Sequence, residues 1–164
     1  MSRYLNNILL ALVWAALTGS FTLANFALGL LLGWLALHTE DAEERRGALA
    51  EGEALLNAGG LVSHNYLMFY RAAIETALET GDWDAALRYA AAVEDYTRSE
   101  PLPWIDFIIA RGRALAAWGR GQRNPAAAAE LGRLRDEAQR IGWAAVLPAI
   151  EAALATATAT HVSA

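Results

Sequence analysis

The chain divides into an apolar stretch and a longer part with helical spacing of apolar residues. No Asp, Glu, Lys or Arg occurs from residue 4 to residue 37, a run of 34 residues. From Glu40 onward, stretches with apolar residues at helical spacing are separated by Gly, Pro and small polar residues. The pattern predicts an all-α chain without strands. Its helices are expected at residues 41–57, 64–80, 84–98, 103–119, 125–141 and 143–156.

Capping residues mark the ends of these predicted helices. Glycine favours the left-handed backbone that closes a helix, and glycines follow four of them: Gly59-Gly60, Gly81, Gly121 and Gly142. Side chains that accept a hydrogen bond from a first helical turn stand at the expected starts: Ser63, Asp82, Ser99 and Asn124. Pro125 follows Asn124, at the first-turn position that tolerates proline.

Two related helix-turn-helix units follow each other. Their turns, at Gly81 and Gly121, are forty residues apart, a period typical of helical-hairpin arrays. The string GDWDAALRYA at residues 81–90 resembles the centre of a tetratricopeptide repeat, and Pro101 and Pro103 end the first unit as such repeats do. We therefore expect a tetratricopeptide-like repeat domain over residues 61–156, with a connecting helix at 39–60 before it and a disordered tail at 157–164 after it.

The uncharged run predicts a membrane-inserted segment over residues 1–38. One helix through it would be about 50 Å long, against the roughly 30 Å of a bilayer core. Thr18-Gly19-Ser20 lies at its middle and favours a transmembrane helical hairpin with arms at 4–18 and 21–37. The alternatives are a single tilted span, a cleaved signal peptide and a buried soluble helix pair.

Three residues of the second arm are candidates for packing between membrane helices. Gly29 and Gly33 form a G-x-x-x-G pair, which lets helices approach closely in lipid. Asn25 is strongly polar and is expected to face another helix. Arg3 and Arg45-Arg46 flank the segment, which by the positive-inside rule places both ends of a hairpin in the cytoplasm.

The string LLALVWAALTGSFTLANFALGLLLGWLAL at residues 9–37 resembles the N-terminal leader of the E subunit of Mrp-type sodium/proton antiporters. The resemblance is carried by Trp14, the T-G-S-F turn at 18–21 and the L-A-N-F run at 23–26 with Gly29. It implies membrane insertion and association with other antiporter subunits. That family continues into a small α/β domain, whereas nothing after residue 40 predicts strands.

Residues 60–154 resemble the C-terminal tetratricopeptide-like repeats of bacterial adenylate/guanylate cyclase-ATPase proteins. The residues that carry this resemblance are Ser63-His64-Asn65, Phe69-Tyr70-Arg71, Asp95-Tyr96-Thr97 and Glu100-Pro101-Leu102-Pro103-Trp104. The chain has no G-x-x-x-x-G-K-[ST] phosphate loop and no identifiable cyclase aspartate pair. The resemblance therefore implies a regulatory fragment without the enzymatic activities of that family.

Composition argues against several classes of site. The chain has no cysteine and three widely separated histidines, so no metal or cofactor site is predicted. Its net charge of −5, with the arginines scattered among carboxylates, argues against a nucleic-acid partner. No arrangement of nucleophile, base or paired carboxylates predicts an enzyme.

Aromatic and arginine side chains recur over the repeat domain. Core packing is the expected role of most aromatic residues, and a concave partner groove is the alternative. Arginines on such a face would hold a carboxylate of the partner. The candidate groove residues are Tyr66, Tyr70, Arg71, Arg88, Tyr89 and Arg111.

These observations predict a non-catalytic scaffold anchored in the inner membrane of a bacterium, with its helical domain in the cytoplasm. Its partners would be membrane lipid and other proteins. The resemblances supply two alternatives. One is an accessory E-type subunit of a monovalent cation/proton antiporter, and the other is a regulatory fragment of a nucleotide cyclase/ATPase signalling protein.

Overall fold

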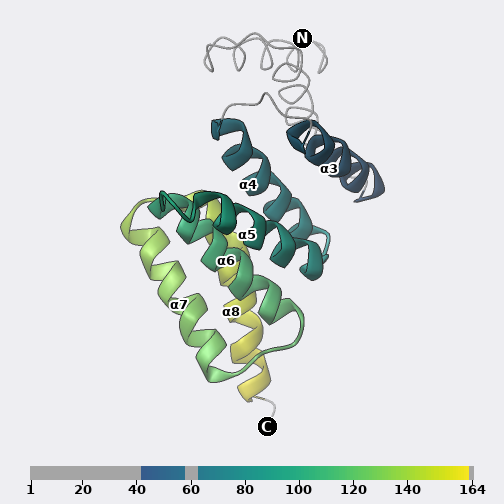
Figure 1. Cartoon of the computed structure of the whole chain (residues 1–164). Coiled ribbons are helices and arrows are strands. Elements are labelled where there is room, and N and C mark those ends of the chain that lie inside the picture. Colours follow the sequence, from purple (N-terminus) through teal and green to yellow (C-terminus); the bar gives the residue numbers. More distant parts are fainter. Residues whose placement is uncertain (1–41, 58–62, 163–164) are drawn as a thin grey trace, which may run out of the picture. The chain divides into compact units, whose positions relative to one another are not determined.

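The computed structural model describes residues 42–57 and 63–162, and all regular structure in these ranges is helical (Figure 1). The all-α prediction is therefore confirmed for this part of the chain. The elements are α3 (Ala42–Asn57), α4 (Ser63–Glu79), α5 (Trp83–Thr97), α6 (Pro103–Gly119), α7 (Pro125–Arg140), the 3₁₀ turn η1 (Ala144–Val146) and α8 (Leu147–Val162).

The predicted membrane hairpin lies outside the described residues, as do its packing residues Asn25, Gly29 and Gly33. Among the helices that the structure does describe, none combines the length and apolarity that a membrane span requires.

Three glycines end helices as predicted, each with a positive φ: Gly81 at 71°, Gly121 at 89° and Gly142 at 73°. Each lies in a pair of backbone hydrogen bonds that closes the helix end. At the first, the amide of Asp82 donates to the carbonyl of Ala77 at 2.9 Å, and that of Gly81 donates to Leu78 at 3.2 Å. This is the Schellman arrangement, which satisfies carbonyls that a helix end leaves unpaired. The predicted Gly59-Gly60 cap lies outside the described ranges.

Two of the predicted N-caps are present. The carboxylate of Asp82 accepts from the amide of Ala85 at 3.0 Å, and the side chain of Asn124 accepts from Ala127 at 2.9 Å. Helix α4 begins at Ser63, but the residues before it lie outside the described ranges, so the cap expected there stays a prediction. The prediction for Ser99 is wrong, because α6 is preceded by Leu102 and begins with Pro103. Proline fixes the helical φ by itself, so α6 begins without a side-chain cap.

The chain forms two compact units, Met1–Thr76 and Ala77–Ala164. Their boundary lies near the end of α4, not at residue 61, where the sequence placed the start of the repeat domain. The sequence of a helix shows which face is apolar but not which neighbour covers it, so this division could not be predicted. In the first unit, the Tyr66 hydroxyl donates to the Leu56 carbonyl at 2.9 Å and joins α4 to α3.

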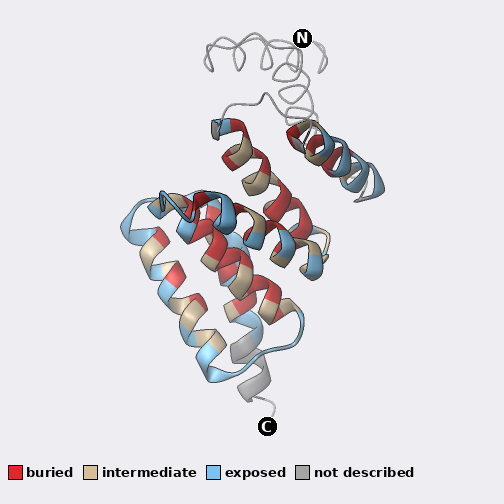
Figure 2. Ribbon diagram, viewed as in Figure 1, coloured by how far each residue is buried: buried red, intermediate tan, exposed pale blue. Residues whose placement is uncertain are grey.

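Helix α6 is central to the second unit, where it contacts α5, α7 and α8. Figure 2 shows buried positions along its length. The fully buried side chains of this unit are mainly aliphatic: Val93, Ile105, Ile108, Leu131, Leu134 and Ile150. Burial of such residues is the main favourable term in folding, worth about 1.5–3 kcal/mol for each side chain.

Helices α5 and α6 run antiparallel with two ion pairs between them. Arg113 pairs with Glu94, and Arg120 pairs with Asp84 at the opposite end. Beside the second pair, the indole ring of Trp83 lies against Gly119, where an added Cβ would stand 2.5 Å from two ring carbons. Only glycine permits this approach, so Gly119 sets how closely the two helices meet.

Helix α8 continues to Val162, beyond the start of the tail predicted at residue 157. The disorder expected for residues 157–164 stays a prediction. Alanine has the highest helix propensity, and the alternation of Ala and Thr in this stretch carries no helix-breaking residue.

Candidate interaction face

Helix α8 and the turn before it lie along one face of α6, held by three contacts. The rings of Phe107 and Trp143 are 5.3 Å apart between centroids. The Nε of Arg111 donates to the Val146 carbonyl at 3.2 Å. Further along, the indole Nε1 of Trp118 donates to the Thr156 hydroxyl at 3.2 Å. Residue numbers increase in the same direction on both sides of these three contacts, so α6 and α8 run parallel.

The offset along the chain is nearly constant in these contacts. It is 35 residues in the Arg111 bond and 38 in the Trp118 bond. Helix α8 therefore packs on α6 as the equivalent helix of the next repeat. Helix α7 connects the two along the chain and contacts both. This register is the geometry of a helical-repeat array, in which each unit packs on its neighbour.

We call the surface that α8 covers the receiving face. On α6, the residues that contact the segment from Trp143 onward include Phe107, Arg111 and Trp118. Helix α7 contacts α6, α8 and the 3₁₀ turn, and its buried residues are Leu131, Leu134 and Ala138. The segment that covers the receiving face presents Trp143, Val146, Ile150 and Ala153, spaced three, four and three residues apart. Only Ile150 and Ala153 lie in α8, whereas Trp143 precedes the 3₁₀ turn and Val146 ends it. No role is predicted for these four residues from the sequence, although their three- and four-residue spacing is visible there.

Two residues of the predicted partner groove are buried instead. Tyr89 is 4 % exposed and Arg111 is 3 % exposed. Tyr89 shares the buried side of α5 with Ala86, Ala90 and Val93, which makes it a core residue. Arg111 hydrogen-bonds a backbone carbonyl of the chain itself. The prediction that they line an open groove is therefore wrong, because an aromatic or arginine in helical spacing gives no information about which face is covered.

The other four candidates are divided between the two units. Tyr66 and Tyr70 are half-buried in the first unit, with ring centroids 6.5 Å apart. Arg71 follows them on α4 and is also half-buried. In the second unit, Arg88 is exposed, with its guanidinium 4.2 Å from the ring centroid of Tyr89.

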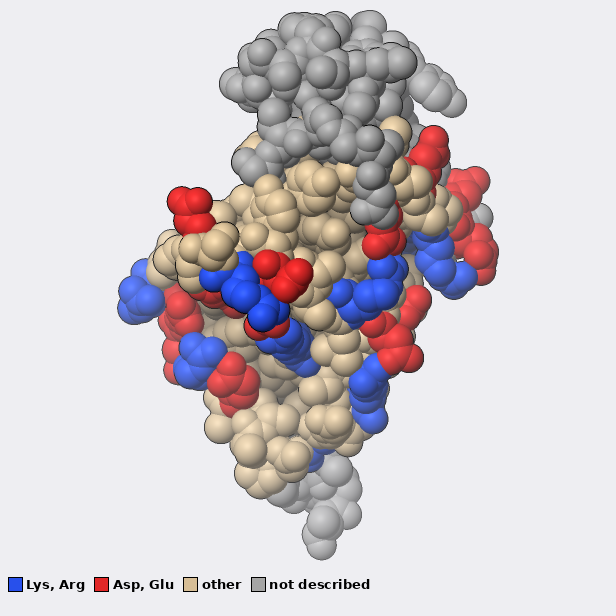
Figure 3. Space-filling view, in the orientation of Figure 1, with Lys and Arg blue, Asp and Glu red and all other residues tan. Residues whose placement is uncertain are grey.

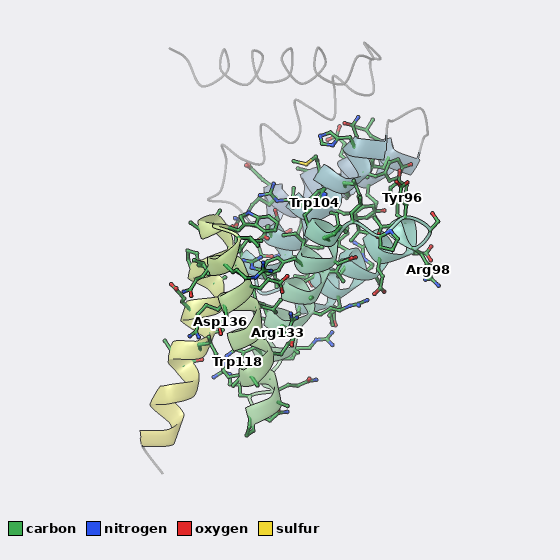
Figure 4. All side chains as sticks on the ribbon, turned by 90° about the vertical axis from the view of Figure 1, so that its left-hand side faces the viewer. Tyr96, Arg98, Trp104, Trp118, Arg133 and Asp136 are labelled. Carbon is green, nitrogen blue, oxygen red and sulfur yellow. The ribbon has the colours of Figure 1, made fainter. Side chains whose placement is uncertain are left out.

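Positive and negative side chains intermingle on the face of the molecule drawn in Figure 3. Most of the arginines on the described surface form ion pairs; those of the second unit are Arg98–Asp95, Arg113–Glu94, Arg120–Asp84, Arg133–Glu130, Arg133–Glu137 and Arg135–Asp136. Tyr96 is 40 % exposed and lies with Arg98 on the side away from α8 (Figure 4). The face drawn in Figure 3 has no broad patch of one charge, so that face does not resemble an electrostatic docking site.

Glu94 and Arg113 form the best-defined ion pair on this surface. Two hydrogen bonds of 2.7 Å join the guanidinium to the two carboxylate oxygens. They lower the pKa of Glu94 below its ordinary value, against a smaller opposing effect of burial. The same bonds raise the pKa of Arg113. The pair therefore joins α5 to α6 in a geometry typical of strong charge-assisted bonds.

We predict a pH-dependent contribution of this pair to stability. A carboxylate whose pKa is lower when folded stabilises the fold above its unfolded pKa, and this contribution disappears as the pH falls through the folded pKa. Glu94→Gln should lower the free energy of unfolding by less than about 1 kcal/mol at neutral pH, since the pair is half exposed. The difference from wild type should shrink as the pH falls through the lowered pKa of Glu94, measured by urea unfolding. Glu100→Gln, on an exposed loop, serves as the control, and a difference that persists at acid pH would contradict the prediction.

In the part of the chain that the structure describes, no group of three or more His, Cys, Asp or Glu residues is placed to hold a metal ion. His64 lies on α4 and is exposed, while His38 is outside the described ranges. The predicted absence of a metal or cofactor remains a prediction for the chain as a whole.

Comparison with known proteins gives no relative. No protein-family model matches the chain, no curated protein matches it, and no solved structure matches its fold. The two family resemblances given by residues 9–37 and 60–154 therefore stay predictions.

Proposed function

We propose that the chain is a protein-interaction scaffold, in which stacked helical hairpins bind protein partners and the uncharged segment 4–37 anchors them in a membrane. The observation that carries the first half is the register of α8 on α6, with an almost constant offset of 35 to 38 residues. Repeat arrays of this kind expose long surfaces relative to their cores, and they commonly use them to bind other proteins.

The anchor rests on the sequence. A run of 34 consecutive uncharged residues exceeds the roughly 20 residues that a helix needs to cross a bilayer, which supports insertion in lipid. Arg3 and Arg45-Arg46 at its flanks favour a hairpin with both ends in the cytoplasm of a bacterium. The partners of the proposed scaffold are membrane lipid and proteins, and no catalytic step is assigned to it.

Membrane fractionation of the full-length chain tests the anchor. The wild-type chain should stay in the membrane pellet after an alkaline wash. Leu31→Arg should release most of it, because an arginine at the centre of a membrane helix is less favourable than leucine by about 3–4 kcal/mol. Glu51→Arg, an exposed change on α3, is the control and should stay in the pellet. A wild-type chain that is monomeric in buffer without detergent would exclude the anchor.

Affinity purification of the same chains tests the scaffold. Proteins recovered with wild type should also be recovered with Leu31→Arg if the helical units bind them. They should be lost with Gly119→Val, which disrupts the contact between α5 and α6. Recovery of integral antiporter subunits that depends on Leu31 would instead support the E-type subunit, the alternative that residues 9–37 suggest.

A further inference from the structure

We draw no further inference here: the strongest candidate, the outward surface of helix α8 on which Pro148, Ala149, Ala152 and Ala155 are exposed, carries nothing because no feature of the described residues shows what covers it.

Discussion

Arg111→Ala should destabilise the second unit by about 2–4 kcal/mol, the largest effect we expect from any charged residue in the described part of the chain. The side chain is 3 % exposed, and its Nε donates to the Val146 carbonyl. Alanine removes the buried stem, leaves a cavity and takes a hydrogen-bond donor from a buried carbonyl, which alone costs about 1–3 kcal/mol. The measurement is the free energy of unfolding in urea, followed by circular dichroism.

Arg113→Ala is the matched control, two residues later on the same helix. Arg113 is 42 % exposed and pairs with an exposed glutamate, so its loss should cost less than about 1 kcal/mol. Arg111→Met keeps most of the stem and should recover part of the loss, because an apolar side chain of similar length fills the space. Equal losses of unfolding free energy for Arg111→Ala and Arg113→Ala would show that the burial of Arg111 does not stabilise the fold.

The helices could be predicted from the sequence because their ends are specified locally. Gly81, Gly121 and Gly142 adopt the left-handed backbone that closes a helix, and Asp82 and Asn124 accept bonds from the next first turn. Each of these effects involves only a few neighbouring residues. Apolar spacing between the caps then suffices to predict the elements to within a residue or two, apart from the last.

The candidate site could not be predicted as well, because it depends on which surfaces meet. Tyr89 and Arg111 have the residue types of a partner groove, yet both are buried. The forty-residue spacing of the turns predicts repeated units, but it does not specify that Trp143 contacts Phe107. A buried arginine is also an unexpected core residue, since burial of its charge requires hydrogen bonds that only the fold provides. Packing between helices therefore determines whether these residues are buried or exposed, and residue type alone does not predict it.

Gly119→Ala should destabilise the second unit by about 1–3 kcal/mol, although alanine is the better helix former by about 1 kcal/mol. An ideal Cβ at this position stands 2.5 Å from two ring carbons of Trp83 and 2.7 Å from a third. The ring must shift, or α5 and α6 must separate, and either change disturbs the packing beside the Arg120–Asp84 pair. Urea unfolding of the full-length chain in detergent measures the loss.

Gly132→Ala is the matched control, because it is also a helical glycine and an added Cβ there meets nothing within 4 Å. It should stabilise the chain by about 0.5–1 kcal/mol. The same substitution is therefore expected to change the free energy of unfolding in opposite directions at the two positions. In a Trp83→Ala background the cost of Gly119→Ala should disappear, since the ring that opposes the methyl group is gone. A cost that persists without the ring would mean that Gly119 is required for another reason, and that Trp83 does not determine the approach of α5 to α6.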